Sequence, residues 1–250
     1  MRITCLLAVV FLMAACDLQP PTPLPTLTPT LTLVPTATIE WFPATETPTV
    51  VPTLPRTPTP DLHPGLGSIV LEDDFSTDEE WFLPSVENTS AAIANQHLTL
   101  VVSRPDYILF TNRKEPLLKD FYAEITVSPN LCSGEDEYGI MVRTSSNLVH
   151  FRFVISCDGR AKVVRASRNN ARVVVPWEHI GVLPSLVPGA SRLAVWAYGE
   201  EIRFFINDQY IFSVRDTVLL EGTFGVFVRT TGDETISVNF SDLVVRGISP

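Results

Sequence analysis

Aromatic rings and an arginine alternate with aliphatic residues in the segment RLAVWAYGEEIRFFINDQYIFSV, from Arg192 to Val214. Gly199-Glu200 and Asn207-Asp208 predict two hairpin turns that join three short strands. Pairing outward from these turns puts one set of side chains on the face toward a second sheet: Leu193, Val195, Ile202, Phe204, Ile206 and Ile211. The opposite face carries Trp196, Tyr198, Arg203, Phe205, Tyr210 and Phe212.

Flat rings that cover the C–H faces of a sugar, beside an arginine that donates to its hydroxyls, are typical of a sugar-binding surface. The candidate ligand-binding residues of this segment are therefore Trp196, Tyr198, Arg203 and Tyr210. The alternative is that these rings are simply buried, for example under the loop that contains Trp177.

A second candidate surface lies on the predicted hairpin between Glu137 and Cys157. If Ser145-Ser146 forms a two-residue turn, the apolar side of this ribbon pairs Val142 with Val149, Ile140 with Phe151 and Tyr138 with Phe153. The other side carries Glu137, Met141, Arg143, His150 and Arg152. Because His150 is the one histidine of four placed on a strand face beside arginines, His150 and Arg152 join the candidate ligand-binding residues. An ordinary exposed histidine is the alternative.

Two cysteines of the same region predict a disulfide. Asp158-Gly159 is a favoured turn dipeptide, and it pairs Phe153 with Val164 and Arg152 with Arg165. The register of the preceding hairpin places Cys157 opposite Gly134, so Cys132 needs a bend at residues 133–136 to come within bonding distance. A zinc site is the alternative, but two cysteines without a histidine at ligand spacing make a poor one.

The N-terminus resembles an export signal. Arg2 precedes an apolar core of about ten residues, which is too short to span a bilayer. Met13-Ala14-Ala15-Cys16 resembles the bacterial lipobox, which implies cleavage after residue 15 and acylation of Cys16 as a lipid anchor. The alternative is an ordinary secretory signal cut near Ala15, with Cys16 as a bystander thiol.

Residues 16–66 are rich in proline and threonine. Thirteen of the 21 prolines lie between Pro20 and Pro64. Such a segment lacks many backbone donors and buries little apolar area, so we expect a disordered, extended linker between the anchor and a folded domain.

Residues 67–250 show short alternating segments separated by turn residues, without a long helical period. The expected strands are 68–75, 96–103, 107–111, 121–128, 137–144, 148–157, 160–167, 172–175, 192–198, 201–206, 209–214, 223–229 and 235–245. So many short strands in one domain indicate an all-β sandwich or barrel.

Several of these segments together resemble a known family. They are LEDDFSTDEEW, DEYGIMVR, FRFVISCDGR, RLAVWAYGEEIRFFINDQY, GTFGVFVRT and VNFSDLVV, and they span residues 68 to 248. They resemble the concanavalin A-like (laminin G and glucanase-type) jelly-roll domains of bacterial surface lipoproteins. The resemblance implies a two-sheet antiparallel jelly-roll sandwich with neighbouring first and last strands. That superfamily includes lectins, adhesion modules and glycoside hydrolases, so the fold alone does not assign a function.

Catalytic motifs are missing from the sequence. A glucanase of this fold would carry Glu-x-Asp-x-x-Glu on one strand, and this motif is absent, as are GxSxG, HExxH and a phosphate-binding glycine loop. We therefore expect no enzymatic activity. Calcium is the one cofactor considered: Asp73, Asp74 and Asp242 would approach one another if the terminal strands pair, although ordinary turn acids are the alternative.

The formal net charge of −10 argues against nucleic acid as a partner. We expect an extracytoplasmic protein, lipid-anchored to the outer face of the cell membrane, that presents a non-catalytic carbohydrate-binding domain to a glycan. A protein-interaction or structural module for a cell-envelope protein is the alternative, and a divergent glycoside hydrolase is a further one. Glycan binding through the aromatic face requires accessible rings, whereas the interaction module predicts buried rings and a separate exposed apolar patch.

Overall fold

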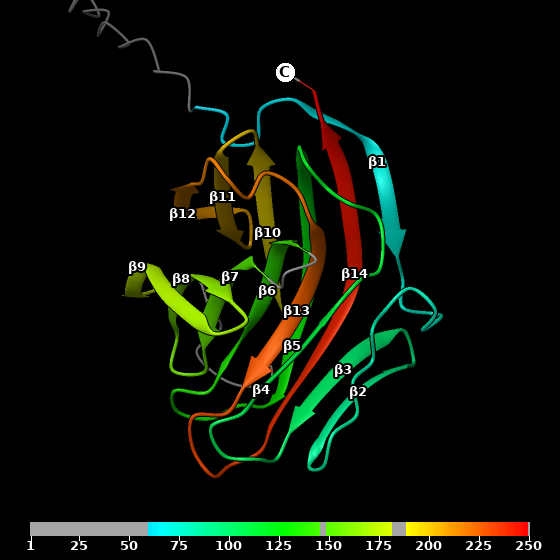
Figure 1. Cartoon of the computed structure of the whole chain (residues 1–250), viewed down its shortest axis with the longest axis vertical. Helices are drawn as coiled ribbons and strands as arrows, with labels where there is room; N and C mark the ends of the chain where they lie inside the picture. The colour runs from blue at the N-terminus through cyan, green and yellow to red at the C-terminus, as the bar shows by residue number, and fades with distance from the viewer. Residues whose placement is uncertain (1–59, 146–148, 182–188, 250) are drawn as a thin grey trace, which may run out of the picture. The chain divides into compact units, whose positions relative to one another are not determined.

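The computed structural model describes residues 60–145, 149–181 and 189–249. Within these residues, 14 strands form two antiparallel sheets (Figure 1). The predicted all-β, two-sheet sandwich is therefore confirmed. In this part of the chain no helix is long and apolar enough to cross a membrane. The predicted signal peptide, Cys16 and the linker up to residue 59 lie outside the described residues.

The larger sheet is built around the long strands β5 and β14. Its eight described strands run in the order β12 (Gln209–Arg215), β11 (Glu201–Ile206), β10 (Ser191–Tyr198), β5 (Phe121–Leu131), β14 (Ile236–Ile248), β3 (His97–Val102) and β2 (Thr89–Ala94), with β1 (Leu66–Asp73) also paired to β14. The first and last strands of the fold are thus neighbours, as the resemblance implied.

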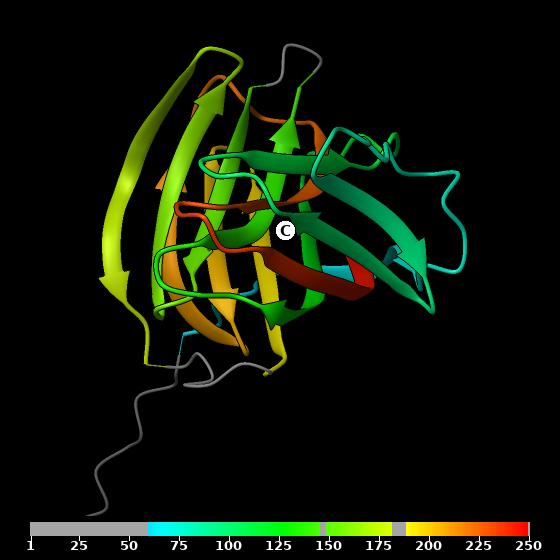
Figure 2. The same cartoon turned by 90° about the horizontal axis from the view of Figure 1, so that it is seen from below.

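The smaller sheet has six described strands in the order β4 (Ile108–Asn112), β13 (Thr223–Arg229), β6 (Glu137–Thr144), β7 (His150–Ser156), β8 (Arg160–Ser167) and β9 (Asn170–His179). β9 contains Pro176, which an edge strand tolerates because its outer backbone groups need no ladder partner. Figure 2 shows β8 and β9 at one edge of the molecule and β2 and β3 at the opposite edge.

The core lies between the two sheets. β3 shows the period of two that produces it, since Leu98, Leu100 and Val102 are fully buried and alternate with half-buried residues. Across the core, the rings of Phe153 on β7 and Phe204 on β11 stack with centroids 5.0 Å apart. Burial of large side chains of this kind supplies most of the stability of such a sandwich.

The β6–β7 hairpin differs from the predicted register by two residues. Val142 pairs with Phe151 and Ile140 pairs with Phe153, so the predicted two-residue turn at Ser145-Ser146 is wrong. A shift of two residues keeps the paired side chains on their predicted faces, because side chains alternate with a period of two. Arg143 is the exception, since its positive φ interrupts the alternation near the end of β6. The division into a core face and an outer face therefore survives the error.

The β7–β8 hairpin differs by one residue, which has a larger effect. Phe153 pairs with Val163 and Arg152 pairs with Val164, because residues 157–159 form a three-residue connection where we expected two. Val163 therefore enters the core, while Val164 and Ala166 turn to the outer face of the sheet. A one-residue shift exchanges the two faces of a strand.

Two further features escaped the sequence prediction. A bulge between Phe204 and Phe205 pairs Phe204 with Phe212, so Phe212 points into the core instead of onto the aromatic face. β2, with the sequence TSAAIA, was not expected as a strand because alanine has a low strand propensity.

Candidate functional site

The outer face of the smaller sheet has its own apolar layer. Met141, Phe227 and Val154 point away from the core, yet each is at most 1% exposed. They are covered by longer side chains on the same face. Among these, Phe110 on β4 and His150 on β7 have ring centroids 6.4 Å apart, although β13 and β6 lie between their strands. Strands three places apart in a flat sheet would be separated by about 14 Å, so these two side chains lean toward each other.

A pocket of about 460 Å³ opens on this face, and we call it the outer-face pocket. It is lined by side chains of β4, β7 and β8 and by the β8–β9 turn: Ile108, Phe110, His150, Arg152, Ala166, Ser167, Arg168, Asn169, Asn170 and Ala171. The predicted candidates His150 and Arg152 are thus both present. Phe110 and the Arg168-Asn169-Asn170 turn were missed. The run of polar residues in that turn was the one sequence signal for it, and Phe110 had none.

Arg152 places a buried polar atom without a partner beside the pocket. Its Nε atom is buried and has no hydrogen-bond partner among the described residues. The guanidinium lies 5.6 Å from the ring centroid of Phe227. Burial lowers the pKa of Arg152 from its ordinary value, the charge of Glu137 opposes this change, and Arg229 adds to it. The side chain is therefore a desolvated cation with an unused donor.

Arg143, which we expected on the same side of the ribbon, has a different role. It is fully buried, and its guanidinium donates to the backbone oxygens of Leu219 at 3.0 Å and Gly199 at 2.8 Å. Its φ of 54° interrupts the alternation of β6. Arg143 therefore connects loops of the sandwich and does not line the pocket.

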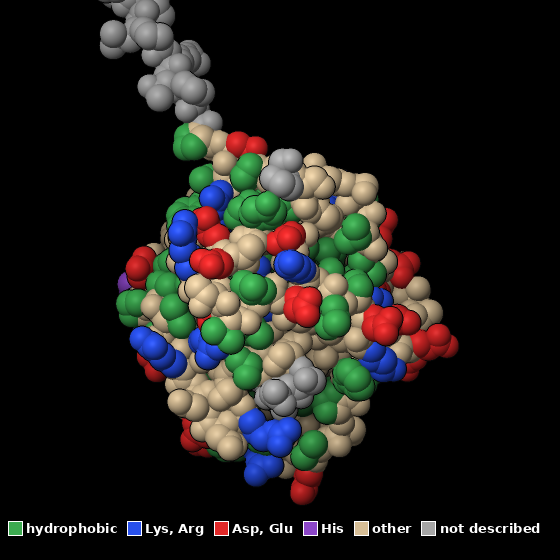
Figure 3. All heavy atoms as spheres, turned by 45° about the horizontal axis from the view of Figure 1, so that its top comes forward, with side chains coloured by type: hydrophobic (Ala, Val, Ile, Leu, Met, Phe, Trp, Pro, Cys, Tyr) green, Lys and Arg blue, Asp and Glu red, His purple; other side chains and the backbone are tan. Residues whose placement is uncertain are grey.

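Beside the pocket, the carboxylate of Glu137 forms ion pairs with more than one cation. Glu137 is 5% exposed, and its Oε1 lies 2.7 Å from Nζ of Lys162 and 3.6 Å from Arg229. The ring of Trp177 on β9 lies 4.1 Å from Lys162 and 5.0 Å from the guanidinium of Arg160. Arg160 is itself paired with Glu135 at 2.7 Å and with Asp158 at 2.6 Å. This end of the face thus combines an aromatic ring with a network of paired charges. In the view of Figure 3, acidic and basic side chains likewise lie interspersed over the surface.

The predicted aromatic face lies on the other sheet, where the chain itself covers it. Trp196 is only 4% exposed, and its Nε1 donates to the backbone oxygen of Pro64 at 3.0 Å. Arg203 lies 4.4 Å over the Trp196 ring and donates to the backbone oxygen of Leu62 at 3.0 Å. Residues 62–65, which we assigned to the linker, therefore dock on this face, and we call them the docked segment.

His63 adds a ring to the docked segment. Its ring lies 4.0 Å from that of Phe205 and 5.3 Å from that of Tyr122, with an edge-on geometry at Tyr122. Tyr198 and Tyr210 remain 38% and 42% exposed. The predicted set of ligand-binding residues is thus divided between two sheets, and Trp196 is not accessible as a platform.

The three aspartates proposed for calcium have other partners. Asp73 accepts hydrogen bonds from the Trp81 indole at 2.9 Å and from Nε of Arg113 at 3.2 Å. Asp74 accepts hydrogen bonds from the side chain and from the backbone N–H of Ser76, and these bonds lower its pKa. Asp242 accepts from the hydroxyl of its neighbour Ser241. No three histidine, cysteine or acidic residues of the described chain form a group that could hold a metal ion, so calcium binding by these three aspartates stays a prediction without support from their geometry.

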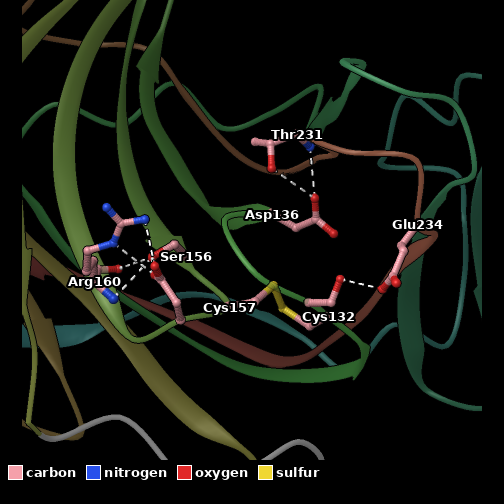
Figure 4. The surroundings of a disulfide bond; sticks show 9 residues. Cys132, Asp136, Ser156, Cys157, Arg160, Thr231 and Glu234 are labelled. Carbon is pink, nitrogen blue, oxygen red and sulfur yellow. Dashed lines mark hydrogen bonds and ion pairs between the residues drawn. A yellow bond between two sulfur atoms is a disulfide. The ribbon is translucent and has the colours of Figure 1, made fainter.

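The predicted disulfide joins Cys132 to Cys157, with Cα atoms 5.5 Å apart (Figure 4). The expected bend is present, since Asp136 donates its N–H to the Ser133 carbonyl at 3.1 Å and Gly134 has a φ of 53°. Asp136 also accepts from the backbone of Thr231 at 2.8 Å. The disulfide thus links the end of β5 in the larger sheet to the end of β7 in the smaller sheet, at a hydrogen-bonded corner near Glu137.

Comparisons with known proteins agree with the architecture. No protein-family model and no curated protein matches the sequence. Among solved structures, the carbohydrate-binding module CBM66 from Bacillus subtilis superposes with a TM-score of 0.54 at 17% identity, over 67% of this chain and 96% of that one. A Bacillus licheniformis beta-glucanase gives 0.56 at 8% identity, over 73% and 99%. The fold is a concanavalin A-like jelly roll.

A further neighbour is a Bacillus subtilis protein of unknown function with a galectin-like fold. Its TM-score is 0.58 at 10% identity, over 74% of this chain and 99% of that one. At these identities the concanavalin A-like similarity shows the fold alone, and the function has to be argued from the site.

Proposed function

We propose that this chain binds glycans without catalysis, through the outer-face pocket. The observation that carries the proposal is the unpartnered, buried Nε of Arg152 at a pocket large enough for a sugar unit. A buried donor without a partner is costly. Because this Nε atom is itself covered, the Arg152 side chain has to turn toward the pocket before a ligand oxygen can accept its hydrogen bond. This site takes the place of the aromatic face that we had favoured from the sequence.

The remaining lining residues suit a sugar. The ring of Phe110 offers an apolar surface for C–H groups, and the side-chain amides of Asn169 and Asn170 can both donate to and accept from hydroxyls. A relative in fold is named a carbohydrate-binding module, which agrees with this chemistry.

Hydrolysis is the competing function, since another relative in fold is named a beta-glucanase. Glycoside hydrolysis needs two carboxyl groups on either side of the scissile bond, about 5 to 10 Å apart. No acid of the described chain lines the pocket. Glu137, the acid beside it, is already paired with Lys162 and Arg229. The pocket therefore lacks the pair of acids that hydrolysis needs, and this argues for binding without turnover.

A protein-interaction role is the second candidate, and one observation favours it. β1 exposes Leu66, Ile69 and Val70 at 45 to 55%. Together with the buried Trp196, these exposed side chains are the pattern we expected for an interaction module. The patch is short, however, and it offers no enclosed site.

We also propose the location. Acylation at Cys16 would anchor the chain on the outer face of the cell membrane, and residues 17–59 would act as a spacer to the sandwich. The lipobox-like Met13-Ala14-Ala15-Cys16 supports this proposal.

A glycan array probed with the full chain in detergent tests the function. We expect at least one bound glycan, with binding lost in Arg152→Gln and retained in Tyr210→Ala, a matched change on the other sheet. Equal loss in both variants, or retention in both, would contradict a site in the outer-face pocket. An assay for new reducing ends on each bound glycan should show no release.

A further inference from the structure

The charged groups around the outer-face pocket are distributed unevenly. Of the described residues that line it, Arg152 and Arg168 carry charge and none is acidic. The chain as a whole has a formal net charge of −10. A pocket with only positive charged groups is therefore a local departure from the overall balance.

The neighbouring part of the face does not neutralise the pocket. Glu137 is shared between Lys162 at 2.7 Å and Arg229 at 3.6 Å. The negative charge of Glu137 also raises the pKa of Arg152, whereas the positive charge of Arg229 lowers it. One carboxylate thus faces three cations, and an excess of positive charge remains at the Arg152 side of the face.

Burial makes this excess costly. A desolvated guanidinium gains little from water, and its Nε has no partner within the described chain. A sugar hydroxyl could accept one hydrogen bond from this atom, but it would leave the charge uncompensated. A carboxylate or sulfate group would accept the hydrogen bond and balance the charge, because the donors of arginine match pairs of oxygens on such anions in geometry.

We propose that the ligand is an acidic glycan whose carboxylate or sulfate group binds Arg152. This inference rests on the proposed glycan function. Arg168 on the β8–β9 turn adds a second cation at the edge of the same pocket. Phe110 and the two asparagines contact the rest of the sugar unit.

Two pairs of polymers with matched backbones test the inference with the full chain. Polygalacturonate is compared with its fully methyl-esterified form, and dextran sulfate is compared with dextran, at low and physiological salt. We expect one charged member to bind at least tenfold more tightly than its neutral partner, with affinity falling as salt rises. The first pair reports on carboxylate and the second on sulfate.

Three variants locate the effect. Loss of a charge-assisted hydrogen bond in Arg152→Gln should weaken binding by about 10- to 100-fold. Arg168→Gln, an exposed change that is harmless to folding, should weaken it less. The control is Arg215→Gln on β12, whose side chain is 75% exposed and belongs to the other sheet, and it should leave binding unchanged.

The outcomes separate the two proposals. Tight binding of a neutral polymer that needs Arg152, with no preference for its charged partner, would overturn the acidic ligand and keep the glycan pocket. Charged polymers that bind equally to all variants would reveal general electrostatic attraction and would also overturn it. Absence of any binding here and on the glycan array would overturn both.

Discussion

Removal of the disulfide should destabilise the sandwich by an amount that follows from its loop length. Cys132 and Cys157 are separated by 25 positions. On the chain-entropy account, a loop of this size contributes about 3.5 kcal/mol to the free energy of unfolding at 25 °C, because the link restricts the unfolded chain. With a urea slope of about 2 kcal/mol/M for a domain of this size, the midpoint should fall by about 1.7 M.

The folded corner around the disulfide should survive its removal. Asp136 remains bonded to Thr231 at 2.8 Å, and the Ser133 hydroxyl remains bonded to Glu234 at 2.6 Å (Figure 4). We therefore expect the Cys132→Ala/Cys157→Ala variant to keep a native far-ultraviolet circular dichroism spectrum, and to lose stability mainly through its freer unfolded state.

Urea unfolding of the full chain measures the difference, for the wild type with and without reductant and for the double variant. Ser133→Ala is the control, because it removes a local hydrogen bond and keeps the covalent link; it should cost about 1 kcal/mol or less. A midpoint within 0.3 M, roughly the scatter of such extrapolations, of the oxidised wild type would refute the unfolded-state argument. A loss equal to that of Ser133→Ala would assign the effect to local contacts instead.

Two further predictions concern the N-terminal side of the chain. Burial lowers the pKa of His63 below 6.5, and the positive charge of Arg203 adds to this shift. The negative charges of Asp61, Asp208 and Glu124 oppose the shift. The undocked histidine therefore binds a proton first as the pH falls, so docking of residues 62–65 should be strongest above about pH 6.5 and weaken below it. The protection factor of the Trp196 indole N–H against hydrogen exchange, which corrects for the intrinsic pH dependence of the exchange rate, should therefore fall at low pH. His63→Phe should remove this fall, and an unchanged fall in the variant would contradict the assignment. For the membrane anchor, labelling of cells with an alkyne fatty acid should mark the wild type and not Cys16→Ser, and equal labelling of both would rule out that anchor.

The strands could be predicted from the sequence because the period of two is a local property. The register between strands could not, because it depends on which residues close each turn. Asp158-Gly159 correctly marks a turn, but the connection also includes Cys157, and that single extra residue sends Val164 to the outer face. The bulge beside Phe205 had the same kind of consequence for Phe212. Each error moves side chains between the core and a surface. A functional prediction depends on this difference, because only surface side chains can contact a ligand.

The two outer faces of the sandwich show what composition cannot reveal about a site. Both combine aromatic rings with an arginine, and the sequence pointed more strongly to the face with Trp196. There, however, the indole and Arg203 already donate to backbone oxygens of the docked segment, and the Trp196 partner is 132 positions away in the sequence. On the other face, the Nε of Arg152 has no such partner in the described chain. An aromatic–arginine pair that the protein satisfies internally stabilises the fold, whereas an arginine donor left unsatisfied at a pocket favours a ligand that can accept its hydrogen bond. The state of the arginine donors, rather than the presence of the rings, therefore distinguishes the two faces.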